Sequence, residues 1–311
     1  MKKIIGIIIL LIIIGGCGFI LHMHKETITE LMHVYFTPSK EITIEQTNEY
    51  YRNYDFDFVQ NTTYFVPDNR QDILNIYYTV LNSGLDTFTF YCPYEYEECL
   101  KEVEQLANDQ NTLSDINNYV HPYNGFSNIE TEYDNIGKVT IKITHNYTQE
   151  QIDAINQKIE ELIPELVLEE NSEYLNIKNI HDYIINNARY DTERKETDNS
   201  PYRSDLAYGP LFDGYALCSG YTDLMELFLE KMNIKSYRIS SEEHVWNAVY
   251  YNYNWLNLDL TWDDPVASDG SDILEQKYFL IDSNELYLLD QEEEKKEHDF
   301  NEEHFYELKR K

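Results

Sequence analysis

The sequence predicts an α+β protein, because segments with helical periodicity alternate with segments in which apolar and polar residues alternate. Between Gly214 and Met232 the apolar and aromatic residues recur at the spacing of one helix face. Between residues 244 and 264, valines and leucines lie two positions apart in two arms, which predicts a β-hairpin. Helix and hairpin follow one another closely, so we expect them to pack together in one domain.

The N-terminus carries a candidate membrane segment. Lys2 and Lys3 precede an uncharged, mostly aliphatic run from Ile4 to Leu21. A helix of that length spans about 27 Å, just enough for a bilayer core, and the lysines favour the cytoplasmic side. We therefore expect residues 1–25 to anchor the protein, with the rest outside the cytoplasm. Cys17, which follows Ile-Gly-Gly, leaves a lipoprotein signal lipidated at that cysteine as the open alternative.

Composition limits the partners. The chain has 311 residues, of which 42% are hydrophobic, enough for one large domain or two modest ones. It carries 24 Lys and Arg against 57 Asp and Glu, a formal net charge of −33. This balance argues against nucleic acid, whose phosphates need a basic surface, and against basic adhesion to anionic lipid.

Residues 26–170 predict a small α+β region without a catalytic cluster. Helical periodicity at 71–83 stops at Gly84, and the alternation that follows predicts a strand at 86–92. The further expected elements are a helix starting at Pro93, two strands within 128–147, and a helix from 149. Thr148 and Gln151 have the spacing of a capping box for that last helix.

Cys92 and Cys99 bracket a short acidic segment. Outside the cytoplasm a disulfide between them is plausible, and two unpaired thiols at the start of a helix remain the alternative. Cys17 falls in the membrane segment. Cys218 is then left as a free thiol.

Cys218 lies where the helix of residues 218–232 begins. Backbone N–H groups without helical partners and the positive end of the helix dipole favour a thiolate over a thiol at such a position. The alternative is that Cys218 is a small apolar residue of the core.

The hairpin supplies partners for this thiol. If its turn is centred between Tyr251 and Asn252, counting back along both arms places His244 directly opposite Asp259. The residue numbers of two paired positions add up to a constant along a hairpin. If that sum differs by two from the one assumed, both side chains stay on one face, whereas a difference of one separates them. An imidazole can take the proton of the Cys218 thiol, and a carboxylate can hold the ring in one tautomer.

Three segments resemble the transglutaminase-like superfamily, especially its bacterial exported members: "AYGPLFDGYALCSGYTDLMELFLEKMNI", "HVWNAV" and "WLNLDLTWDDP". The resemblance covers roughly residues 175–290, and its closing strand would be "KYFLID". It implies a papain-like core over 171–290, with Cys218 as nucleophile, His244 as general base and Asp259 orienting the histidine. Family members include glutamine cross-linkers, peptide N-glycanases and proteases, so the fold does not choose the reaction.

Further site residues follow with less support from the pattern. The backbone N–H of Cys218 is the natural oxyanion donor, and we expect Tyr208 and Trp246 to contact substrate, with a packing role as the alternative for each. Asp263 and Asp264 lack further ligands at metal spacing, so we interpret them as capping and turn residues. We expect neither a metal nor a cofactor.

Together these features predict a membrane-tethered thiol enzyme that acts on amide bonds of proteins or cell-wall peptides at the cell envelope through a cysteine thioester. Hydrolysis and acyl transfer both remain open. The alternative from another class is a non-catalytic binding or scaffolding module of the same fold. A helix at 175–188 would open the catalytic domain of residues 171–290, and the charged residues 291–311 would form a solvated tail.

Overall fold

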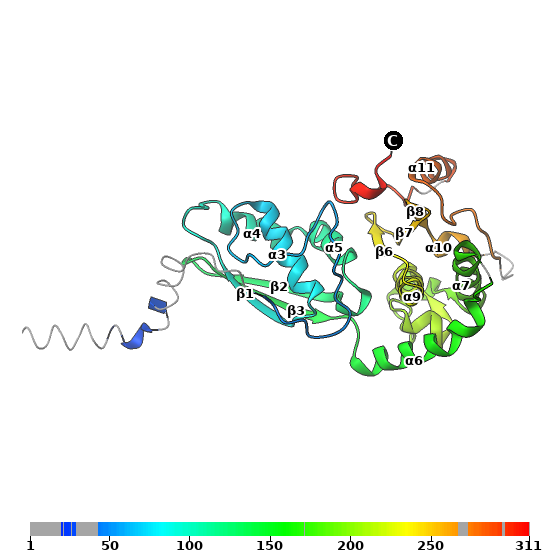
Figure 1. The fold of residues 1–311 in the computed structure, drawn as a ribbon, viewed down its shortest axis with the longest axis horizontal. Coiled ribbons are helices and arrows are strands. Elements are labelled where there is room, and N and C mark those ends of the chain that lie inside the picture. Colours follow the sequence, from blue (N-terminus) through cyan, green and yellow to red (C-terminus); the bar gives the residue numbers. More distant parts are fainter. Residues whose placement is uncertain are drawn as a thin grey trace, which may run out of the picture.

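The computed structural model describes residues 20, 22–25, 27–28, 43–170, 172–266, 273–293 and 296–310. It has the mixed α+β architecture that the sequence predicts, in two lobes that lie side by side (Figure 1). Cys17 and most of the expected anchor lie outside the described residues. Among the helices that are described, none is long and apolar enough to cross a membrane.

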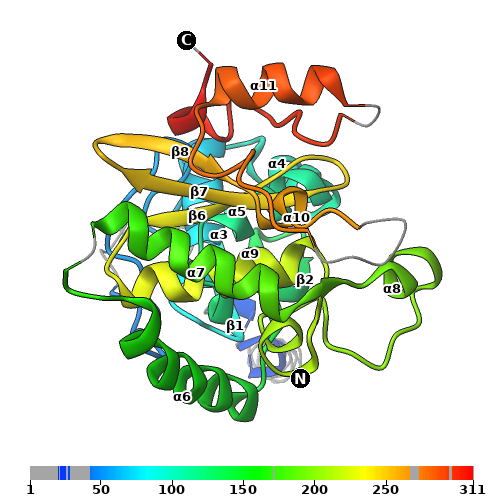
Figure 2. The same cartoon turned by 90° about the vertical axis from the view of Figure 1, so that its right-hand side faces the viewer.

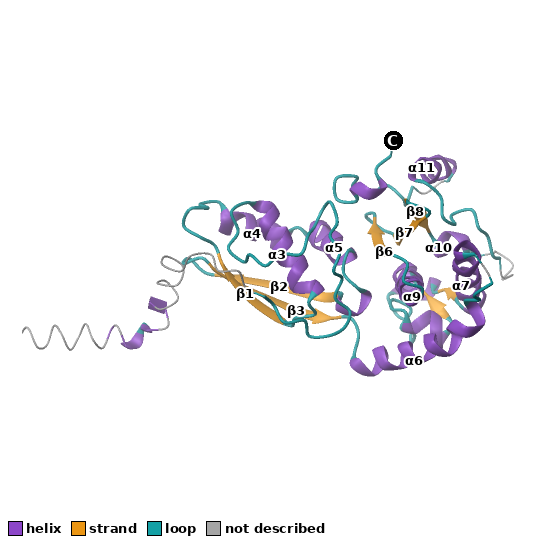
Figure 3. Ribbon diagram, viewed as in Figure 1, coloured by secondary structure: helices purple, strands orange, loops and turns teal. Residues whose placement is uncertain are grey.

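The first lobe is a three-stranded antiparallel sheet with helices along one side (Figure 3). Its strand order is β1-β3-β2. The elements are α3 (Arg70–Asn82), β1 (Thr87–Tyr91), α4 (Cys99–Asn108), α5 (Gln110–Asn118), the 3₁₀ turn η1 (Pro122–Asn124), β2 (Phe126–Tyr133) and β3 (Lys138–His145). Val139 and Ile141 of β3 are buried against the helices, as their alternation predicts.

The helix expected from Pro93 begins only at Cys99, because residues 94–98 form turns. A disulfide joins Cys92 to Cys99, with their Cα atoms 5.7 Å apart. It ties the end of β1 to the first residue of α4. Both cysteines are buried in the core of the first lobe.

The second lobe is built in layers around a second antiparallel sheet, of order β6-β7-β8. Helices α9 and α7 lie on one side of this sheet and α11 on the other (Figure 2). The long elements are α6 (Gln149–Leu166), α7 (Glu173–Asn187), α9 (Cys218–Lys231), β6 (Ser236–Ser240), β7 (Val245–Tyr251), β8 (Asn254–Leu258) and α11 (Ser283–Glu292). The short ones are β4 (Arg189–Tyr190), α8 (Thr192–Thr197), the π-helical turn η2 (Gly209–Asp213), β5 (Tyr215–Ala216), α10 (Leu260–Asp263) and the 3₁₀ turn η3 (Tyr306–Leu308).

Two boundaries differ from the sequence analysis. Helix α6 has the predicted capping box at Thr148, but its apolar face, including Ile155 and Ile159, packs in one core with α7 and α9. It therefore belongs with the second lobe rather than with residues 26–170. The closing strand expected at residues 277–282 is reduced to an isolated bridge between Asn257 and Ile281.

The expectation of a solvated C-terminal tail is wrong. We call residues 296–310 the C-terminal segment. Its side chains His298, Phe305 and Leu308 are buried, and the Tyr119 hydroxyl of the first lobe donates to the His304 carbonyl oxygen over 2.5 Å. His304 also pairs with Asp115 of α5 at 2.7 Å. A few apolar and aromatic residues are enough to dock a segment that is otherwise charged.

Helix α9 is a central helix rather than a surface one. Every residue from Gly220 to Leu229 is buried, including the acidic Asp223 and Glu226. Glu226 forms an ion pair with Arg52 of the first lobe, and Asp223 pairs with Arg238 of β6 at 2.9 Å. Burial raises the pKa of Glu226 to about 6, although both arginines act to lower it. The pairs therefore hold α9 to both lobes at a substantial desolvation cost.

We expect Arg52→Met to lower the free energy of unfolding by about 3–5 kcal/mol, because it leaves Glu226 buried without its main cationic partner. The double variant Arg52→Met/Glu226→Met should recover most of this loss, since Arg238 keeps Asp223. Urea denaturation measures both. The exposed pair Lys142–Glu132 is the matched control, and Lys142→Met should cost less than about 1 kcal/mol. Equal effects of Arg52→Met and Lys142→Met would contradict this account.

Candidate active site

Cys218 is the first residue of α9 and is partly exposed. The N-cap residue, Leu217, has no side chain that can accept from the helix, so the first N–H groups of α9 have no capping acceptor. A Cβ atom on Gly220 would overlap the carbonyl oxygen of Ser204, which accepts from the Leu217 N–H at 2.7 Å. Glycine at position 220 therefore lets the preceding loop pack closely against the start of the helix and fix Cys218 there.

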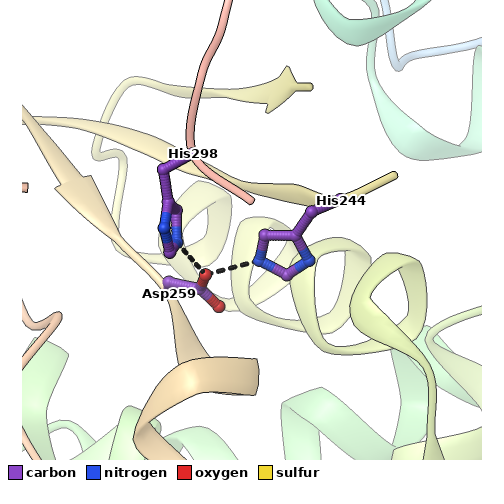
Figure 4. Close-up of side chains that lie close together, drawn as sticks. All are labelled: His244, Asp259 and His298. Carbon is purple, nitrogen blue, oxygen red and sulfur yellow. Dashed lines mark hydrogen bonds and ion pairs between the residues drawn. The ribbon is translucent and has the colours of Figure 1, made fainter. Parts of the chain in front are cut away.

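His244 and Asp259 lie at the open end of the β7–β8 hairpin, directly before β7 and directly after β8. The turn is Asn252-Tyr253, one residue later than predicted, and both residues have positive φ (49° and 63°). This conformation suits a tight two-residue hairpin turn. The pairing sum changes by two, so His244 and Asp259 are not directly opposite but stay on one face. His244 Nε2 lies 2.5 Å from Asp259 Oδ2, as Figure 4 shows.

The electrostatics favour a charged histidine. Burial acts to lower the pKa of His244, but the Asp259 carboxylate and then a hydrogen bond and charge interaction with Cys218 raise it to about 10. Burial acts to raise the pKa of Asp259, but His244 and His298 together hold it well below its usual range. Because His244 Nε2 is taken by Asp259, the nitrogen left for the thiol is Nδ1. The structure thus brings together the three residues predicted from the sequence.

The two side chains expected to contact substrate, Trp246 and Tyr208, differ in burial. Trp246 is 1% exposed, stacks on the His244 ring with centroids 5.7 Å apart, and donates from Nε1 to Asn257 Oδ1 at 2.9 Å. It therefore shields the histidine from water and has no surface for a substrate, which corrects the expected binding role. Tyr208 is half-buried against Phe212, with ring centroids 4.6 Å apart. Its contact with substrate stays a prediction.

Asp263 and Asp264, which the sequence predicts as capping and turn residues, are buried hydrogen-bond acceptors. Asp263 accepts from His181 Nε2 at 3.2 Å and from the Tyr278 N–H at 2.9 Å, and Asp264 accepts from the Tyr221 hydroxyl. These contacts hold α10 against α7, α9 and residue 278. The two carboxylates are therefore satisfied by protein donors.

Two residues near the site escaped the sequence analysis. His298 of the C-terminal segment lies with Nε2 2.9 Å from Asp259 Oδ2 and is buried. Tyr190 of β4 is paired with Ala216, two residues before Cys218. Burial, and then the charges of Cys218, Glu297 and Asp259, raise the pKa of Tyr190, so its hydroxyl stays protonated. Nothing in the local pattern around either residue marked it as part of a site.

One family model matches part of the second lobe, and two solved structures are similar to part of the chain. Residues 160–260 match the family model described as the transglutaminase-like superfamily. A solved structure described as a TGase covers 44% of this chain and is itself covered over 44% of its length, at 17% identity and a TM-score of 0.33. A candidate cysteine protease from Cytophaga hutchinsonii covers 47% of this chain and is covered over 65% of its length, at 16% identity and a TM-score of 0.28.

The chain thus spans less than two thirds of either of these structures. No curated protein matches the chain. The family match includes Cys218, His244 and Asp259, the three residues that the structure brings together. Residues 160–260 therefore form a transglutaminase-like superfamily domain.

Proposed function

We propose that this protein is a thiol enzyme that cleaves or exchanges amide bonds through a thioester on Cys218. The observation that carries the proposal is the position of His244, which contacts Cys218 on one side and the buried Asp259 on the other. This order of groups is what a cysteine nucleophile requires for activation. The partial exposure of Cys218, with His244 and Asp259 buried behind it, leaves the thiol as the group that meets substrate.

In the first half-reaction the Cys218 thiolate attacks the amide carbonyl carbon and forms an S–C bond. The carbonyl oxygen becomes an oxyanion at the start of α9, where the Cys218 N–H can donate to it. The Tyr190 hydroxyl, near the thiol, is better placed as a side-chain donor than Tyr208, which packs on Phe212. The His244 imidazolium then gives its Nδ1 proton to the departing nitrogen, the C–N bond breaks, and a thioester remains.

In the second half-reaction His244 is neutral and acts as a base. It takes a proton from the acceptor, whose oxygen or nitrogen attacks the thioester carbon. The S–C bond breaks, and the thiolate and imidazolium are restored. Water as acceptor makes the enzyme a peptidase or amidase, and an amine makes it a transglutaminase.

The proposal extends to the cellular location of the enzyme and to the class of its substrate. The aliphatic run that precedes His22 supports a tethered enzyme whose catalytic domain lies outside the cytoplasm. Proteins or cell-wall peptides of the envelope are then the amide substrates within reach. The formal charge of −33 favours polypeptide substrates over nucleic acid.

An activated ester tests whether Cys218 forms the intermediate. Para-nitrophenyl acetate should give a burst of nitrophenolate and one acetyl group on Cys218, seen by mass spectrometry of the intact protein and its peptides. Cys218→Ala should carry none, and His244→Ala should acylate far more slowly at pH 7 because the thiolate loses its partner. An added primary amine that accelerates release of the acetyl group would favour acyl transfer. If Cys218 stays unacylated in folded wild-type protein, the result would favour the alternative hypothesis of a non-catalytic binding module.

We expect Asp259→Asn to lower turnover about 10³–10⁴-fold with the fold retained, because an amide whose oxygen keeps the backbone N–H groups of α10 turns its nitrogen, a donor, toward His244 and cannot accept the hydrogen bond from Nε2. Asp263→Asn is the matched control, since Asp263 is equally buried but contacts His181 instead. It should lower stability by about 1–3 kcal/mol and leave turnover of the folded enzyme nearly unchanged. Deacylation rates, with circular dichroism on each variant, measure the difference. Equal losses of turnover in the two variants would contradict the assignment of Asp259.

A further inference from the structure

We propose that His298, in the C-terminal segment, is a positioning residue for the His244–Asp259 pair. The inference rests on the proposed function, since it assigns a second histidine to the same catalytic machinery. In the part of the chain that the structure describes, the hydrogen-bond partners of His298 are Asp259 and Asp290. It acts through Asp259.

The Asp259 carboxylate is fixed through both of its oxygens. Oδ1 accepts the backbone N–H groups of Thr261 and Trp262 at the start of α10, over 2.9 and 3.2 Å. Oδ2 accepts from two imidazoles at once, His244 Nε2 at 2.5 Å and His298 Nε2 at 2.9 Å (Figure 4). The direction of Oδ2 toward His244 is therefore set partly by His298.

His298 is itself held rigidly. Its Nδ1 lies 3.1 Å from Asp290 Oδ1 on α11, and its ring stacks on Tyr278 with centroids 5.3 Å apart. The rings of Trp246 and Trp262 also pack against the His298 ring, with centroid-to-centroid distances of 5.0 and 5.2 Å. Carboxylates only accept hydrogen bonds, so both contacts are satisfied when each ring nitrogen carries a proton. An imidazole of the C-terminal segment thus meets Asp259 Oδ2, while the start of α10 holds Oδ1.

A metal ion is the competing explanation. Donor atoms of His244, Asp259 and His298 all lie within 4.8 Å of one another, close enough for three ligands of one ion. However, the N–O distances of 2.5 and 2.9 Å are those of direct hydrogen bonds. An ion needs about 2.0–2.2 Å to each ligand and would have to push these atoms apart. The geometry favours protons between the three groups.

Removing the His298 donor should loosen Asp259 Oδ2 and let the His244 ring depart from the line to Cys218. Small misplacements of a catalytic group cost turnover while leaving binding intact, so the loss should appear in kcat rather than KM. This separates positioning from a purely structural role, which would lower stability and leave the kinetics of the folded fraction unchanged.

Two substitutions of His298 isolate the donor. In His298→Gln the amide nitrogen can occupy the place of Nε2 and still donate to Asp259, whereas in His298→Asn the amide reaches only the place of Nδ1, toward Asp290. Both remove the ring and its stacking. We expect His298→Gln to keep turnover of para-nitrophenyl acetate within about threefold of wild type, and His298→Asn to lower kcat on the order of 10-fold or more with little change in KM. The rate of iodoacetamide labelling of Cys218 should fall in the same order.

His304→Asn controls for docking of the C-terminal segment, because it removes the contact with Asp115 without touching Asp259, and should leave kcat unchanged. The proposal is wrong if Gln and Asn variants lose kcat equally, in proportion to their stability. It is also wrong if zinc copurifies with the protein at one equivalent or if chelation changes the wild-type rate. If Cys218 of the wild-type protein is neither acylated nor rapidly labelled, the proposed function itself is wrong. This outcome is distinct from a failure of the His298 proposal.

Discussion

The buried carboxylate of Asp259 is the group on which the arrangement of the site depends. It is 1% exposed and stays ionised because four donors surround it: two imidazoles and two backbone N–H groups. A buried charge is tolerated only when such charge-assisted hydrogen bonds offset its loss of water. One imidazole comes from the hairpin, the other from the C-terminal segment, and the two N–H groups from the start of α10. The carboxylate therefore fixes these three parts of the chain relative to one another.

The site also depends on contacts between the lobes. Cys218 is at the start of α9, and α9 is held by Arg52 of the first lobe and Arg238 of β6 through its buried acids. The C-terminal segment places His298 on Asp259 and, six residues later, His304 on Asp115 of α5. The first lobe, which has no catalytic residue of its own in this account, therefore contacts both α9 and the C-terminal segment.

Local patterns singled out Cys218, His244 and Asp259, because a helix start and a hairpin both have short-range signatures, and their roles came from the resemblance to the transglutaminase-like superfamily. The turn of the hairpin lies one residue later than predicted, because Asn252 and Tyr253 both take positive φ, and each pairing partner is therefore displaced by two residues. The burial of Glu226 could not be predicted, because its partner Arg52 is 174 residues away and no local spacing relates them. His298 was missed for the same reason, since it lies among charged residues that resemble a solvated tail, and only the fold brings it to Asp259.

The most direct test of the central claim is the protonation of His244 in the folded protein. Nitrogen NMR of protein labelled with ¹⁵N-histidine, assigned with the His244→Ala variant, distinguishes an imidazolium from a neutral ring. Because Asp259 and Cys218 raise the pKa of His244 to about 10, its signals should be those of an imidazolium at pH 8. A His244 ring that is neutral at pH 8 would contradict the account of Asp259 as the group that holds a charged histidine beside the thiol.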